Sequence, residues 1–165
     1  DGIRDLVLSL VGSEMCIRDR GVFYGIGLTT DKAHFVKAIM EGVSFAIRQC
    51  IETVESLGIS IDQVRAVGGG LKSPVWLAVL GKILAKPILT VSVPDTSNLG
   101  NALLCGSALG IYPCLDEAVS RLVTTGQRVF YETKTQVYED QYALFLELYQ
   151  QLKGTFERYP TTNQE

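Results

Sequence analysis

The chain has 165 residues, of which 47% are hydrophobic, and a formal net charge of −3 with a pI near 5.2. This length suits one domain with a buried core, and the dispersed basic residues give no electrostatic case for a nucleic-acid partner. No run reaches the roughly 20 apolar residues of a membrane span, which argues against a membrane protein.

The cysteine pattern argues against a disulfide framework or a zinc site. The four cysteines are Cys16, Cys50, Cys105 and Cys114. No pair of them has the CxxC spacing, and His34 is the only histidine available as a nitrogen ligand. We therefore expect separate, reduced thiols in a cytoplasmic protein.

Residues 1–20, DGIRDLVLSLVGSEMCIRDR, differ in character from the rest of the chain. The run LVLSLVG is not preceded by a basic segment or followed by a small-residue cleavage site, so it does not fit a signal peptide. The stretch resembles a translated sequencing-adapter read-through, and we interpret it as a non-native leader. The predicted domain then covers residues 21–158, truncated at its start, and residues 159–165 form a polar tail.

Residues 21–58 predict an entry segment followed by a long helix. GVFYGIGL, residues 21–28, mixes aromatic and β-branched residues and predicts a strand or an extended segment. Thr30 or Asp31 can cap a helix whose apolar residues recur at steps of three and four until Gly58. This spacing predicts one amphipathic helix.

The next segments alternate between strand and helix. VRAVGGG, residues 64–70, predicts a buried strand that ends in a glycine loop. An apolar helical pattern runs from Ser73 until Lys86-Pro87, and the β-branched run ILTVSV, residues 88–93, predicts another strand. Strands that alternate with helices indicate an α/β fold.

Three further helices are predicted after that strand. The first, residues 98–109, is crowded with small residues and can approach a sheet or a second helix closely. The second covers residues 115–123. The last carries an aromatic stripe, which predicts a core or domain-interface surface; its members are Tyr138, Tyr142, Phe145 and Tyr149.

The loop GGGLKSPVW, residues 68–76, leaves two interpretations open. A strand that ends in glycines and leads into a helix exposes backbone N–H groups where a nucleotide can approach, but a structural turn needs glycines as well. The spacing is not that of a P-loop. A dinucleotide fingerprint, Gly68-x-Gly70-x-x-Ser73, lacks its third small residue, although Asp95 lies where the ribose-binding acid would.

The segments around this loop resemble the FGGY family of carbohydrate kinases. GVFYGIGLTTDKAHFVKAIMEG, residues 21–42, resembles the family's second signature, and VGGGLKSPVW resembles its adenosine motif. The signature positions are Gly21, Phe23, Gly25, Ile26, His34, Phe35, Ala38, Ile39, Met40 and Glu41. Residues 95–112 and 129–153 resemble the family's later helices, with Asp95 in place of the commoner Glu and Asn101 in place of Ala. The resemblance covers residues 21–155 and is nearest to xylulose kinase-like members.

This resemblance implies a partial ribonuclease H-like domain of the sugar kinase, heat-shock protein and actin superfamily. It implies binding of ATP with Mg²⁺, with Gly68, Gly69, Gly70 and Ser73 at the adenosine. Arg48 and Glu52 are candidate contacts to the adenine.

The family also implies that the sugar or polyol pocket, the phosphate turn and the catalytic base lie in an amino-terminal domain upstream of Gly21. The chain alone is then expected to be inactive. The sequence leaves open whether the protein forms a homo-oligomer.

Other conspicuous residues have simpler structural interpretations. His34 lies near a helix start and is expected to pack or cap. Trp76 lies on an apolar helix face and is expected to pack in the core rather than stack on adenine. Two acidic pairs, Asp116-Glu117 and Glu139-Asp140, begin helices and need no explanation beyond the helix dipole.

Two alternatives to a kinase remain at this point. A dinucleotide-binding domain of an oxidoreductase would bind NAD but not ATP, and Ser73 argues against it. A non-catalytic module of the same superfamily would lack a base aspartate in the upstream region.

Overall fold

The computed structural model describes residues 21–91, 96–129 and 135–158. They form two compact units. Within the described residues, the first unit comprises residues 21–60, 82–84 and 135–158, and the second comprises residues 61–81, 85–91 and 96–129. The predicted leader and tail lie outside the described residues. None of the described helices has the length and apolar character that crossing a membrane requires.

The long helix of the first unit is α1, Lys32–Ser56, as the sequence spacing predicts. Asp31 is its N-cap, because the side chain accepts hydrogen bonds from the backbone N–H groups of Ala33 and His34. Gly58 follows the helix with φ of +85°, a conformation that favours glycine. Of the strand or extended segment predicted at residues 21–28, no strand forms: these residues have no regular secondary structure and end in a turn.

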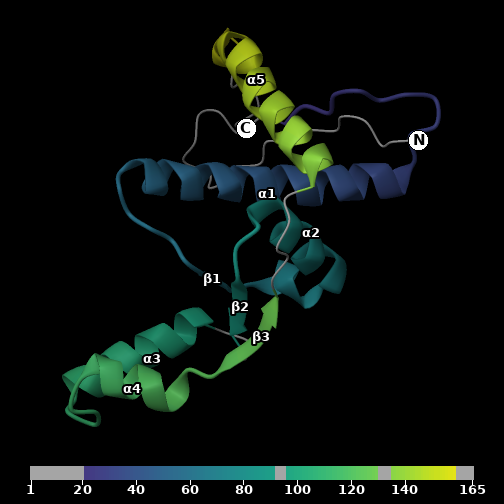
Figure 1. Ribbon diagram of the computed structural model, residues 1–165. Helices are drawn as coiled ribbons and strands as arrows, with labels where there is room; N and C mark the ends of the chain where they lie inside the picture. Colours follow the sequence, from purple (N-terminus) through teal and green to yellow (C-terminus); the bar gives the residue numbers. More distant parts are fainter. Residues whose placement is uncertain (1–20, 92–95, 130–134, 159–165) are drawn as a thin grey trace, which may run out of the picture. The chain divides into compact units, whose positions relative to one another are not determined.

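The second helix of this unit is α5, Gln136–Arg158, which packs across α1 (Figure 1). Phe45 of α1 is 1% exposed, and its ring centroid lies 5.7 Å from those of both Tyr142 and Phe145. Tyr138 contacts Phe45 edge-on. The aromatic stripe of the last helix therefore lies in the core against α1, as expected for three of its four members.

The second unit is built on a three-stranded sheet in the order β1-β2-β3 (Figure 1). Strand β1, Val64–Ala66, is parallel to β2, Ile88–Val91. Strand β3, Thr125–Val129, is antiparallel to β2 and was not predicted. Its sequence TGQRV contains glycine and polar residues, so pairing with β2 rather than local propensity makes it a strand.

The predicted strand at residues 64–70 is shorter and less buried than expected. It ends at Ala66, and the side chain of Val67 is 53% exposed. The helix that comes after the loop is α2, Pro74–Leu84, whose last three residues belong to the first unit. Ala85 ends α2 in the left-handed conformation just before Pro87, so the predicted stop is confirmed.

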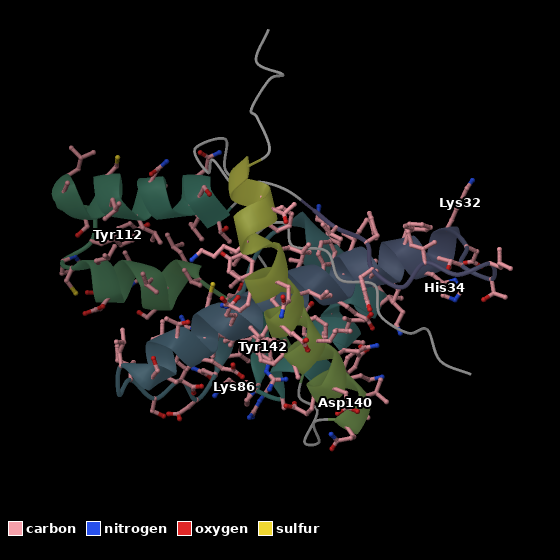
Figure 2. The ribbon with its side chains drawn as sticks, turned by 90° about the horizontal axis from the view of Figure 1, so that it is seen from above. Lys32, His34, Lys86, Tyr112, Asp140 and Tyr142 are labelled. Atoms are coloured by element: carbon pink, nitrogen blue, oxygen red, sulfur yellow. The ribbon has the colours of Figure 1, made fainter. Side chains whose placement is uncertain are left out.

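The small-residue helix is α3, Thr96–Ala108, and it packs beside α4, Leu115–Leu122. Figure 2 shows Tyr112 between these two helices. A Cβ placed on Gly106 would lie 2.9 Å from a carbon of the Tyr112 ring, so α3 needs glycine there to admit the ring. The predicted close approach is confirmed, and it is made by an aromatic ring at a helix-to-helix connection.

Candidate functional site

The glycine loop connects β1 to α2 through a single 3₁₀ turn, η1, Gly69–Lys72. The N–H of Leu71 donates to the carbonyl of Gly68 over 3.3 Å, and the N–H of Ser73 donates to that of Gly70 over 3.1 Å. Backbone hydrogen bonds therefore give this turn a compact shape.

Gly68 is a glycine because of its backbone conformation. Its φ is +117° and its ψ is 168°, a region that is essentially restricted to glycine. A Cβ placed there would meet nothing within 4 Å, so the requirement is conformational and not steric. Gly68 thus turns the chain out of the strand.

Gly70 is a glycine because the ring of Trp76 lies against it. A Cβ at this position would be 2.8 Å from Cζ3 and 2.9 Å from Cε3 of Trp76. Both contacts are closer than a methyl group and a rigid ring tolerate. Trp76 is half-buried and not part of the buried core, where it was expected, and its ring packs against Gly70.

Gly69 has neither of these reasons to be a glycine. Its φ is not positive, and a Cβ there would meet nothing within 4 Å. The residue is exposed. Within the described residues, the fold does not explain why position 69 lacks a side chain. The loop is thus closed by a ring at Gly70 and open at Gly69.

Ser73 caps α2. Its Oγ accepts a hydrogen bond from the N–H of Trp76 over 3.3 Å, and Pro74 occupies the first helical position. A hydroxyl oxygen that accepts one bond can still donate its own proton. Ser73 can therefore stabilise the helix and offer a donor beside the loop at the same time.

Arg48 and Glu52, the predicted adenine contacts, lie in the first unit and bind each other. Arg48 Nε donates to Oε1 of Glu52 over 2.8 Å, and the hydroxyl of Tyr142 donates to Oε2 of Glu52 over 2.6 Å. The guanidinium carbon also lies 4.0 Å from the centroid of the Tyr142 ring. Both residues are committed to contacts between α1 and α5.

Glu139 completes this cluster and corrects one prediction. Its two carboxylate oxygens accept from Nη1 and Nη2 of Arg48 over 2.8 and 2.7 Å. A role limited to the helix dipole is therefore wrong for Glu139. We call Arg48, Glu52, Glu139 and Tyr142 the helix clasp.

The clasp changes the acidity of its own members. Burial of Arg48 would lower its pKa, but hydrogen bonds from its guanidinium to Glu139 and Glu52 outweigh that effect and raise the pKa. Burial, together with the hydrogen bond to Glu52, raises the pKa of Tyr142. The clasp therefore favours a charged arginine and a neutral tyrosine.

The sequence named Glu41 only as a position of the family signature, and the structure shows that it is a buried acid of the first unit. Glu41 is 3% exposed, and its Oε1 lies 3.1 Å from Nζ of Lys37. Burial, together with the charge and hydrogen bond of Glu41, raises the pKa of Tyr138 to about 12. The position of Glu41 on the inner face of an amphipathic helix was the sequence signal for its burial.

His34 has the capping role that the sequence predicts. Its Nδ1 lies 2.5 Å from Oδ1 of Asp31 at the start of α1 (Figure 2). The hydrogen bond between the side chains of His34 and Asp31 is the main cause that lowers the pKa of Asp31. Both groups serve the helix start.

The remaining predicted groups add no further ligand set. Asp95 lies outside the described residues, as does Cys16. Cys50, Cys105 and Cys114 are free thiols. In the ranges that the structure describes, no three metal-ligating side chains cluster.

Comparison with known proteins identifies the family. The profile described as "FGGY family of carbohydrate kinases, C-terminal domain" matches residues 14–109 of the chain. The chain belongs to this family. The profile match begins inside residues 1–20, so the boundary of the non-native leader stays a prediction.

The relatives found by sequence extend well beyond the length of this chain. A xylulose kinase from Staphylococcus epidermidis is 26% identical over 81% of this chain and 27% of its own length. A glycerol kinase from Saccharolobus islandicus is 32% identical over 59% of this chain and 20% of its own.

A crystal structure confirms the α/β fold class. The xylulose kinase of Rhodospirillum rubrum superimposes with a TM-score of 0.77 at 27% identity, over 95% of this chain and 32% of that one. The chain thus spans about a third or less of the relatives it matches, and corresponds to part of their carboxy-terminal domain.

Proposed function

We propose that this chain forms the ATP-binding carboxy-terminal part of a carbohydrate kinase. In this proposal the whole protein transfers the γ-phosphate of ATP to a hydroxyl group of a sugar or polyol. Membership of the carbohydrate kinase family supports the reaction class and disfavours the dinucleotide alternative. The single observation that carries the site is the open surface at Gly69, which the fold itself does not require.

The proposed nucleotide site consists of Gly68, Gly69, Gly70 and Ser73. A bare backbone lets the planar adenine ring approach without contact with a Cβ, and the Ser73 hydroxyl keeps a proton to donate. Contacts of Arg48 and Glu52 with the adenine stay a prediction. In the structure, polar atoms of both side chains bond within the helix clasp.

The chemistry assigned to the whole protein is an in-line displacement. The acceptor hydroxyl oxygen forms a bond to the γ-phosphorus, the bond from that phosphorus to the β-γ bridging oxygen breaks, and the hydroxyl proton passes to a base. This transfer depends on positioning and on charge stabilisation. In this proposal, this chain positions ATP, and the amino-terminal domain of the whole enzyme supplies the base.

The Mg²⁺ that accompanies ATP would be held mainly by phosphate oxygens and one or two carboxylates. We assign none of the described residues to it, because they contain no cluster of metal-ligating side chains. A pentulose, hexose or polyol is the proposed acceptor class, with xylulose kinases among the relatives. We place the whole enzyme in the cytoplasm, where ATP is available and free thiols stay reduced.

Exchange of Gly69 for leucine tests the site. Titration calorimetry of the 165-residue chain with ATP and Mg²⁺ is expected to show binding, and Gly69→Leu should weaken it at least about tenfold. The leucine side chain would occupy the surface that the nucleotide needs. Its effect on the free energy of unfolding should stay within about 0.5 kcal/mol, because the position is open.

Gly154→Leu is the matched control. Gly154 lies in α5, and a Cβ there also meets nothing within 4 Å, so the ATP dissociation constant should not change. Equal ATP affinity in wild type and Gly69→Leu would refute the proposed site. Binding of NAD without binding of ATP would instead favour the dinucleotide alternative.

A further inference from the structure

Trp76 contacts the glycine loop at two separate points. Two carbons of its ring lie 2.8 and 2.9 Å from the position that a Cβ on Gly70 would take, and its backbone N–H donates to Oγ of Ser73. Ser73 in turn donates its N–H to the carbonyl of Gly70. The indole, the turn and the helix cap therefore form one connected set of contacts.

This arrangement gives the loop a closed side and an open side. The ring of Trp76 takes up the space beside Gly70, while the space beside Gly69 is free. A flexible glycine segment would otherwise have many conformations available, since glycine loses the most backbone entropy on ordering. A rigid ring against Gly70 removes much of that freedom before any ligand arrives.

We infer that Trp76 is a positioning residue for the nucleotide and acts through Gly70 without touching the ligand. This inference rests on the proposed function and adds a residue to it. The ring holds η1 in the shape that presents Gly69, so that less of the binding energy is spent on ordering the loop. Trp76 and Gly70 should then behave as a coupled pair.

Substitutions of Trp76 test the role of the ring. Trp76→Ala is expected to weaken ATP binding about tenfold and to speed cleavage by trypsin after Lys72, which lies in the same turn. Trp76→Phe keeps an aromatic ring beside Gly70 and should restore most of the affinity and most of the protection from trypsin.

A control separates positioning from general loss of stability. Leu80 lies on the same helix and is 4% exposed, so Leu80→Ala should destabilise the chain as a core deletion does. With both variants folded under the assay conditions, Leu80→Ala should leave the ATP dissociation constant unchanged. Equal losses of affinity in Leu80→Ala and Trp76→Ala would overturn the inference.

A double-mutant cycle tests the contact itself. Gly70→Ala pushes a methyl group into the ring and should weaken ATP binding about tenfold, and Trp76→Leu makes room for that methyl group. The double variant should lose less affinity than the two single losses combined, with a coupling of about threefold or more. Additive losses would overturn the inference.

The outcomes distinguish this inference from the function beneath it. Failure of the wild-type chain to bind ATP would refute the proposed function. Binding by wild type with no loss in Trp76→Ala would refute the positioning role alone. A loss in Trp76→Phe as large as in Trp76→Ala would show that the indole contacts the nucleotide directly, which contradicts action through Gly70.

Discussion

Gly68 adopts backbone angles that a residue with a Cβ reaches only under strain. Gly68→Ala should therefore lower the free energy of unfolding by about 1–3 kcal/mol. The neighbouring Gly69→Ala should change it by no more than about 0.5 kcal/mol, because its backbone is unstrained and its surroundings are open. Denaturant unfolding of both variants makes the comparison, and equal effects would contradict the assigned conformation of Gly68.

The three adjacent glycines show what a sequence can and cannot separate. In the sequence they are equivalent members of one motif. In the structure Gly68 has a positive φ, and Gly70 leaves room for the ring of Trp76 from α2. A Cβ on Gly69 would meet no atom within 4 Å. The side chain that distinguishes Gly70 belongs to Trp76, six residues away in the chain. The sequence alone therefore predicted the loop but not the separate structural reason for each of its three glycines.

At the scale of elements, the helix clasp joins α1 to α5 through a buried guanidinium. The side chain of Arg48 is 8% exposed, whereas those of Glu139 and Glu52 are 33% and 42% exposed. Arg48→Met should lower the free energy of unfolding by about 1–3 kcal/mol, between the values for surface and buried ion pairs. Urea unfolding measures this loss.

The exposed pair of Arg121 and Glu117 on α4 is the matched control. Arg121→Met should cost no more than about 0.5 kcal/mol, as for other exposed pairs one helical turn apart. A loss of ATP affinity in Arg48→Met with unchanged stability would instead assign Arg48 to the adenine, as the family resemblance implies.

The tyrosines of the same helix pair predict a stability that falls in alkali. Both Tyr138 and Tyr142 have raised pKa values in the folded chain, so below about pH 10 both states keep the phenol proton and stability is unaffected. Above that, the unfolded chain loses the proton first, and stability falls until the folded-state pKa of about 12 for Tyr138 is passed.

Phenylalanine variants isolate this contribution. Tyr142→Phe should be less stable than wild type near neutral pH, because Glu52 loses a hydrogen bond. Between pH 10 and pH 12 its stability should decline less steeply than that of wild type, by at most about 1.4 kcal/mol per pH unit. Urea unfolding across that range measures both slopes, and parallel curves would contradict the assignment.

At the scale of the whole molecule, local sequence signals decide where the helices start, and long-range contacts decide the rest of the pairing. The starts of α1 and α2 were predictable, because Asp31 and Ser73 bond backbone groups two or three residues away. Strand β3 was not predictable, since its hydrogen bonds come from β2, which lies far back in the sequence. The bidentate pair in the helix clasp joins residues 91 positions apart, and no local pattern announces such a partner.

The sequence by itself predicted the α/β class, the starts and periods of the main helices, the glycine loop and the family. The helix starts, the periods and the loop depend on residues within a few positions of one another, and the fold class and the family follow from the order of such local patterns along the chain. Only the tertiary structure decided that Trp76 fills the space beside Gly70, that Gly69 stays open and that Arg48 binds Glu139. Those facts depend on side chains brought together by packing, and packing selects among partners that sequence spacing leaves equivalent.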